Sequence, residues 1–441
     1  MHPLEAGLFL FLLTLIRSPL YQAAMEISYK DAHRKYALHA YNIMIKPVGP
    51  VCNLNCTYCY YLEKKNLYRE AESFRMNEEV LESFIRQYIQ SQTVPTISFV
   101  WQGGEPTLLG LDFFEKVLEL QEKYAGNKQI INSLQTNGTR LDERWARFLA
   151  HNNFLTGISI AGPQHLHDHY RTDKKGNGSF REVIRGIQLL KEHGAEFNTL
   201  TVVNNHNVHY PKEIYAFLRS IGSRFMQFIP IVEQQADPSE GAPLELISPD
   251  YSGKAHVTDW SVSSRDYGKF LTGIFDEWVV RDVGRYFVQI FDTTLANWVS
   301  HDPGLCVFDT TCGEAAVLEH NGDLYSCDHF VYHENYLGNI LQTPIQQLMK
   351  SEKQIQFGLK KETSLPETCH KCRFLRVCRG GCPKNRIHTP AETNKRINHL
   401  CEGYQHFFSH VAPYMNFMTE ELAHKRPPAN VMQWARYRFA K

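Results

Sequence analysis

The sequence lacks features that would point to several common classes of protein. Its net charge is zero, with 47 Lys and Arg against 47 Asp and Glu, so no broad basic surface for nucleic acid is expected. It has no apolar stretch of the roughly twenty residues that a membrane-spanning helix needs, no internal repeat and no complete P-loop or dinucleotide fingerprint. Because 43% of its residues are hydrophobic, a disordered chain is also excluded. We expect a folded protein with no nucleic-acid partner and no stable membrane insertion.

The apolar run near the N-terminus, Ala6 to Ile16, has eleven residues and is too short to span a membrane. The preceding MHPLE carries no Lys or Arg, which a signal peptide would have. Met25 opens a polar stretch and is an alternative start to Met1. We therefore expect residues 1–40 to be an extension of a cytoplasmic protein, with export or a weak membrane or partner anchor as the alternatives.

Six apolar, β-branched segments alternate with amphipathic segments of helical periodicity. Parallel neighbouring strands need crossover connections of this length, so the alternation predicts an α/β fold with a parallel sheet. The expected strands are residues 41–47, 96–104, 129–138, 155–162, 197–205 and 225–233. The expected helices lie near residues 77–91, 111–124, 142–150, 180–193, 210–221 and 263–285.

Polar or glycine-rich residues follow the first five strands: CNLNC, QGGEP, QTNG, AGP and NN. In barrel enzymes the carboxyl ends of the strands meet at one rim, where the active site lies. Any single ending is explained equally well as a turn, but five together favour a site.

The eleven cysteines fall into two groups, unlike a disulfide scaffold, and this favours metal or cluster ligation in a reducing compartment. The first group follows the first strand and consists of Cys52, Cys56 and Cys59. Three thiolates are one short of a closed zinc site, whereas on a four-iron cluster they leave one iron open to a small molecule. The other eight fit two four-cysteine sites, of zinc or of iron–sulfur type. These eight are Cys306, Cys312, Cys327, Cys369, Cys372, Cys378, Cys382 and Cys401.

The CxxxCxxC spacing after the first strand resembles that of the radical S-adenosylmethionine enzymes. The resemblance implies a partial (β/α)6 TIM-like barrel in which a [4Fe-4S] cluster binds S-adenosylmethionine and cleaves it reductively to a 5′-deoxyadenosyl radical. It also implies cofactor contacts from the GGEP loop, from the third and fourth strand ends and from nearby aromatic and basic side chains, although single positions could be turn residues instead. The implied cofactor-binding residues are Tyr58, Gly103, Gly104, Glu105, Pro106, Gln135, Asn137, Ser159 and Arg171.

The second cysteine group resembles the auxiliary-cluster domain called SPASM, with a structural zinc ribbon as the alternative. The resemblance implies two further [4Fe-4S] clusters, three in all. One would be held by Cys306, Cys312, Cys327 and Cys382, and the other by Cys369, Cys372, Cys378 and Cys401.

The segments IKPVGPVCNLNCTYCYYLEK, FVWQGGEPTLLGLDFF and CRGGCPKNR are similar to those of anaerobic sulfatase-maturating enzymes. The resemblance implies oxidation of a sulfatase Cys or Ser to Cα-formylglycine, with Asp328 as the base and an auxiliary cluster as the electron acceptor. It places Tyr61 and Gln102 near the substrate, and implies a sulfatase polypeptide and an electron donor such as flavodoxin or ferredoxin as partners. Where the family typically has an Asp, this chain has Ala161, which leaves the strength of cofactor binding open.

The same resemblance divides the chain into an extension, a radical S-adenosylmethionine barrel, a linker of loop and helices, a SPASM domain and a C-terminal helix and tail. Their expected bounds are residues 1–40, 41–235, 236–300, 301–404 and 405–441. Two other functions stay open: a SPASM-type radical enzyme that crosslinks or epimerises a ribosomal peptide, and a non-catalytic electron carrier or zinc protein. The three-cysteine loop with its GGEP partner argues against the last.

Overall fold

The computed structural model describes residues 40–68, 73–240, 244–301, 303–389 and 395–439. In this part of the chain the main sheet has ten strands, in the order β12-β11-β10-β1-β2-β3-β4-β5-β6-β9. The first six strands are parallel neighbours in chain order, which confirms the expected α/β fold. They are β1 (Asn42–Lys46), β2 (Thr96–Trp101), β3 (Gln129–Thr136), β4 (Leu155–Ser159), β5 (Phe197–Val203) and β6 (Phe225–Pro230).

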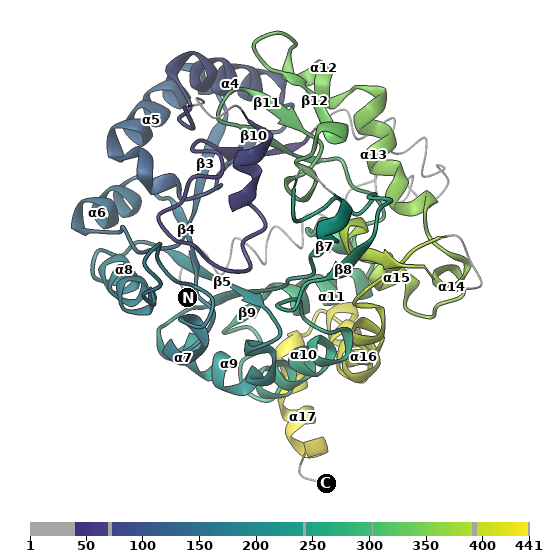
Figure 1. Ribbon diagram of the computed structural model, residues 1–441. Helices are drawn as coiled ribbons and strands as arrows, with labels where there is room; N and C mark the ends of the chain where they lie inside the picture. The colour runs from purple at the N-terminus through teal and green to yellow at the C-terminus, as the bar shows by residue number, and fades with distance from the viewer. Residues whose placement is uncertain (1–39, 69–72, 241–243, 302, 390–394, 440–441) are drawn as a thin grey trace.

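The helices between these strands cover the outer face of the curved sheet, which forms a partial barrel (Figure 1). Their starts follow local signals in the sequence: the Asn77 side chain accepts a hydrogen bond from the Val80 N–H at 2.9 Å and caps the first helix. These helices are α4 (Glu78–Ser91), α5 (Leu111–Ala125), α6 (Glu143–His151), α7 (Gln164–His167), α8 (Phe180–Glu192) and α9 (Pro211–Ser220).

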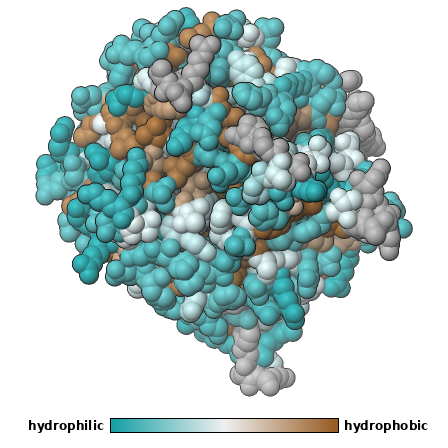
Figure 2. Space-filling model, viewed as in Figure 1, coloured by the Kyte–Doolittle hydropathy of each residue, from teal (hydrophilic) through white to brown (hydrophobic). Residues whose placement is uncertain are grey.

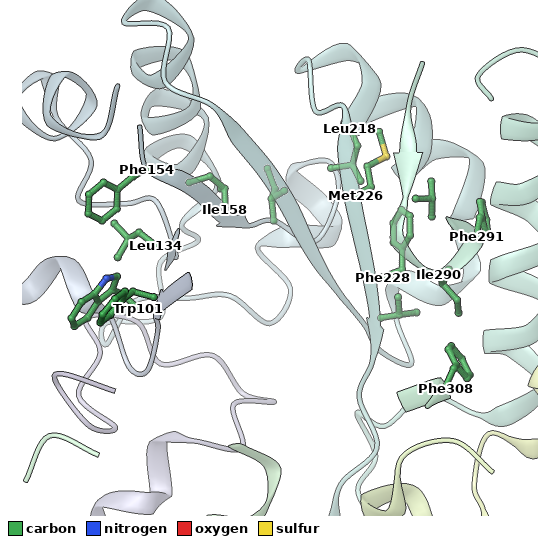
Figure 3. Packing of buried hydrophobic residues seen from close by; sticks show 14 of the residues in the cluster. Trp101, Leu134, Phe154, Ile158, Leu218, Met226, Phe228, Ile290, Phe291 and Phe308 are labelled. Carbon is green, nitrogen blue, oxygen red and sulfur yellow. The ribbon is translucent and has the colours of Figure 1, made fainter. Parts of the chain in front are cut away.

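Apolar side chains from neighbouring strands form a continuous core. Figure 3 shows Trp101, Leu134 and Ile158, from β2, β3 and β4, lying close to Phe154. The indole N–H of Trp101 donates to the Asn132 side chain at 2.9 Å, so this fully buried ring leaves no polar atom unpaired.

The cysteine-rich part of the chain extends the barrel sheet, which the sequence patterns did not predict. Strand β10 (Ala315–Glu319) pairs in parallel with β1, and β11 (Asp323–Tyr325) and β12 (Tyr336–Asn339) continue the sheet as antiparallel strands. At the other edge β9 (Phe287–Val288) pairs with β6. The loop that carries Cys327 and Asp328 is therefore anchored directly beside the first strand of the barrel.

The segment expected as a loop and helices between the two parts contains a small hairpin as well. Strand β7 (Gln234–Ala236) pairs with β8 (Ala255–Val257), and α10 (Ser264–Val279) and α11 (Gln289–Trp298) follow. The long helix α16 (Cys401–Ala423) packs against α10. Because α16 begins at Cys401, the expected domain boundary at residue 404 lies inside this helix.

In the part of the chain that the structure describes, no helix is long and apolar enough to cross a bilayer. Of the expected extension only Ala40 is among the described residues; its apolar run Ala6 to Ile16 and the two candidate start residues lie outside them.

Candidate active site and cluster-binding sites

The loop that carries Cys52, Cys56 and Cys59 follows β1 and lies inside the ring of strands (Figure 1). Backbone bonds join it to the GGEP loop: the Gly104 N–H donates to Gly49 O at 2.9 Å and the Glu105 N–H to Val51 O at 2.8 Å. A Cβ at position 104 would lie 1.8 Å from Val51 O. Glycine is therefore required at position 104, because only a residue without a Cβ lets the backbone approach the cysteine loop so closely.

The Glu105 side chain is fully buried and ties two strand ends together. One oxygen accepts from the Thr107 N–H, the Thr107 hydroxyl and the Thr136 hydroxyl, at 3.1, 2.6 and 2.7 Å. The other accepts from the Asn137 N–H at 2.7 Å. Because this carboxylate already has four donors, we assign it to positioning of the rim; its predicted role as a cofactor contact stays a prediction.

Several of the other predicted cofactor residues contact one another at this rim. The Asn137 side chain donates to Cys52 Sγ at 3.7 Å and to Asn53 Oδ1 at 2.9 Å. The Gln135 amide donates to Ser159 Oγ at 3.1 Å across β3 and β4. Their convergence beside the three-cysteine loop agrees with the expectation that the strand ends build one site.

A buried pair of a cation and a phenol, Arg171 and Tyr58, includes a residue of the cysteine loop itself. Arg171 donates to the Tyr58 hydroxyl at 3.1 Å, and both side chains are buried. Ala161, where the family typically has an Asp, is also buried, and its N–H donates to His167 Nδ1 at 3.3 Å.

Asp328 lies between two residues that the sequence reasoning missed. Lys46 Nζ is 2.6 Å from Asp328 Oδ1, and the Tyr60 hydroxyl donates to Oδ2 at 2.6 Å. Burial on its own would raise the pKa of Asp328, but Lys46, His329 and Tyr60 outweigh it and hold the pKa below its ordinary value. Asp328 is therefore ionised at neutral pH and can accept a proton.

Lys46 could have been noticed in the sequence, because it is a charged residue inside the apolar strand segment YNIMIK. It is 1% exposed, and a Cβ at Gly103 would lie 2.7 Å from its Cδ. Gly103, the first glycine of GGEP, therefore leaves room for the side chain of Lys46, the partner of Asp328.

The predicted substrate residues Tyr61 and Gln102 both lie next to the end of β1. The Tyr61 hydroxyl donates to Glu319 on β10, and Lys46 Nζ, which pairs with Asp328, lies 4.3 Å from the centre of the Tyr61 ring. The Gln102 N–H donates to Ile45 O at 2.8 Å and continues the β1–β2 pairing. Contact of either residue with the substrate stays a prediction.

The eight cysteines of the second group separate into two sets in space. Set A consists of Cys306, Cys312, Cys327 and Cys382, and set B of Cys369, Cys372, Cys378 and Cys401. In set A, burial and then Cys382 and Cys306 raise the pKa of Cys327, and Cys382 and Cys306 also act on Cys312. In set B, all four thiols line one cavity of about 130 Å³.

The thiol chemistry fits bound iron–sulfur clusters. Burial raises the pKa of Cys52 to about 12, that of Cys312 to about 12 and that of Cys378 to about 12, so the free thiols would be protonated and a bound metal is needed to keep them as thiolates. Across the described ranges, no three His, Cys, Asp or Glu side chains are arranged to hold a single metal ion.

A partial α/β barrel with a three-cysteine loop after its first strand, followed by a second cysteine-rich region, defines a radical S-adenosylmethionine enzyme with auxiliary iron–sulfur sites. Residues 47–218 match the radical SAM superfamily, and residues 306–373 match SPASM, an iron-sulfur cluster-binding domain.

The chain belongs to the family of anaerobic sulfatase-maturating enzymes. It is 49% identical to a serine-type anaerobic sulfatase-maturating enzyme of Bacteroides thetaiotaomicron over 89% of this chain and 94% of the relative. It is 35% identical to a cysteine-type enzyme of Clostridium perfringens over 84% and 96%. The structure resembles that of native anSMEcpe with bound AdoMet, with a TM-score of 0.75, 34% identity and coverage of 86% of this chain and 99% of that one.

Proposed function

We propose that this protein oxidises a cysteine or serine side chain of a sulfatase to Cα-formylglycine. The observation that carries the proposal is the position of Asp328, which directly follows Cys327 of set A and is bonded to Lys46 and Tyr60 at the edge of the barrel. A proton acceptor and an electron acceptor thereby lie side by side, as a net two-electron oxidation of a thiol or alcohol requires.

Three [4Fe-4S] clusters and S-adenosylmethionine, when bound, would supply a 5′-deoxyadenosyl radical at the three-cysteine loop and an electron acceptor at sets A and B. The loop residues Cys52, Cys56 and Cys59 would hold the first cluster, with Asn137 donating to the Cys52 sulfur. The contacts proposed for S-adenosylmethionine are those of the rim: Tyr58, Gly103, Gly104, Glu105, Pro106, Gln135, Asn137, Ser159 and Arg171.

In the reaction Asp328 would accept the proton of the substrate thiol or hydroxyl, after a Cβ hydrogen has been removed. Lys46 would keep the carboxylate ionised and Tyr60 would fix its orientation. Tyr61 and Gln102 would line the approach of the substrate side chain.

An extended peptide segment of a sulfatase is the proposed substrate. Figure 2 shows apolar surface on the face viewed in Figure 1, with mainly hydrophilic surface around it. Apolar surface at the site would help to exclude water when the substrate segment is bound. The electron donor is proposed to be a flavodoxin or a ferredoxin, and the compartment to be the cytoplasm, where eleven thiols stay reduced.

The test of this function is anaerobic incubation of the reconstituted protein with S-adenosylmethionine, a reductant and two sulfatase peptides that differ only in Cys or Ser at the target position. We expect formylglycine from the serine peptide, since the chain is 49% identical to a serine-type enzyme, as well as from the cysteine peptide. Mass spectrometry reports the product as a loss of two hydrogens from serine. Conversion of neither peptide, with S-adenosylmethionine cleaved normally, would contradict the proposal.

Replacing Gly104 with Ala should disable the radical site. The new Cβ would meet Val51 O at 1.8 Å and push the GGEP loop away from the cysteine loop. A displacement of about 1 Å is enough to lower turnover about 100-fold, so we expect that loss in 5′-deoxyadenosine formation, measured by chromatography.

The matched control for this change is Gly126→Ala. Gly126 has a positive φ of 59°, unlike Gly104, but a Cβ there meets no atom within 4 Å. It should cost about 1 kcal/mol of backbone strain and leave cofactor cleavage unchanged. Equal activity of the two variants would refute the steric explanation.

A further inference from the structure

Two fully buried cations lie in the cysteine-rich region without a carboxylate partner. Lys361, on α13 (Glu352–Thr363), is 0% exposed, and Arg386 is 5% exposed. Within the described ranges, the hydrogen bonds that these two side chains donate go to backbone carbonyls and to a Ser hydroxyl, and none goes to an Asp or Glu carboxylate. Buried charges are normally paired, so these two need another source of negative charge.

Their hydrogen bonds go mainly to backbone carbonyls. Lys361 Nζ donates to Cys306 O, to Val307 O at 3.0 Å and to Asp309 O. Arg386 donates to Lys361 O at 2.6 Å, to Gly380 O at 3.2 Å and to the Ser364 hydroxyl. These bonds satisfy the donors and fix both side chains, but carbonyl groups carry no net charge to balance them.

Lys361 lies against set A, because its ammonium group donates to the backbone carbonyl of Cys306. Burial lowers the pKa of Lys361, and Cys312, Cys382 and Cys306, followed by Asp309, oppose that shift. The Asp309 carboxylate already accepts from the Thr310 N–H. Lys361 is thus a positive charge aimed at the set that includes Cys327, the neighbour of Asp328.

Arg386 contacts the segment that joins the two sets. It donates to Arg379 O and to Gly380 O, both at 3.2 Å, between Cys378 of set B and Cys382 of set A. Burial lowers the pKa of Arg386, and Cys369, Cys382, Cys312 and Cys378, two from each set, oppose that shift.

We propose that Lys361 and Arg386 balance the charge of the auxiliary clusters and favour their one-electron reduction, Lys361 at set A and Arg386 at both sets. The source of that electron rests on the proposed function. In that reaction the substrate would give a Cβ hydrogen atom to the deoxyadenosyl radical, a proton to Asp328 and one electron to the cluster at set A. A fixed positive charge in a buried site favours the more negative, reduced state.

The experiment is a redox titration of the anaerobically reconstituted full chain, followed by electron paramagnetic resonance, without sulfatase peptide. The variants are Lys361→Gln, which removes the charge and keeps N–H donors, and Lys361→Arg, which keeps the charge. The control is Lys360→Gln on the same helix, where the lysine is exposed and paired with Asp250. Iron and sulfide analysis accompanies each titration.

We expect Lys361→Gln to move the midpoint of one auxiliary cluster to a more negative potential, while Lys361→Arg and Lys360→Gln match the unmodified protein. Loss of iron from set A in Lys361→Gln but not in Lys361→Arg would equally support charge balance. An unchanged midpoint in fully loaded Lys361→Gln, or the same iron loss in both Lys361 variants, would overturn the inference. Because no peptide is present, failure of formylglycine formation would leave this result unaffected.

Discussion

Replacing Asp328 with Asn should stop formylglycine formation while S-adenosylmethionine is still cleaved. Asn keeps the size of the side chain but cannot accept the substrate proton, and loss of a positioned base typically costs 100-fold or more, up to about 10,000-fold. The three-cysteine loop is on a different segment, so radical formation should continue. Mass spectrometry of the peptide and chromatography of 5′-deoxyadenosine, from one reaction mixture, measure both.

The control for this substitution is Asp250→Asn, at an exposed carboxylate that pairs with the exposed Lys360; it should leave both products unchanged. If Asp328→Asn lowered both products equally, Asp328 would be a structural residue. Unaltered formylglycine would remove it from the mechanism.

Replacing the three loop cysteines, Cys52, Cys56 and Cys59, with Ala should abolish cofactor cleavage altogether. No other thiols in the described structure are placed in this loop, so its cluster has no substitute ligands. The iron content should fall from about twelve to about eight per chain, since each [4Fe-4S] cluster carries four. Iron analysis and 5′-deoxyadenosine formation measure the two effects.

The matched comparison is Cys401→Ala, which removes a thiol that lines the set B cavity. This variant should also lose about four irons, yet it should still cleave S-adenosylmethionine, because the three-cysteine loop after β1 is intact. If cleavage survived in the triple variant, the assignment of the loop as the radical site would be wrong.

The six barrel strands and the helices between them could be predicted because their signals are local. Alternating and helical periodicities are legible within a short window of sequence, and capping residues such as Asn77 mark the helix ends. Strand β10 gave no such signal. Its pairing with β1 joins Ala315–Glu319 to residues far earlier in the chain, and nothing within AAVLE specifies that partner.

The site shows the same division between local and distant information. Cysteine spacing separated the three-cysteine loop from the other eight thiols, and the resemblance to SPASM implied the two sets of four into which the structure gathers those eight. The partners of Asp328 were missed, because Lys46 and Tyr60 become its neighbours only when β10 docks on β1. The role of Glu105 as a cofactor contact stays a prediction; what the sequence did not predict is that its carboxylate also accepts from Thr107, Thr136 and the Asn137 N–H.

The parallel pairing of β1 with β10 also governs how the protein is made. During synthesis β1 emerges among the first described residues, yet one of its edges stays without a partner until residue 319 has left the ribosome. An open strand edge invites association with other chains, and pairing between distant segments is slow. The nascent barrel therefore depends on late completion by the cysteine-rich region, and a chain that ends before β10 would release an aggregation-prone barrel.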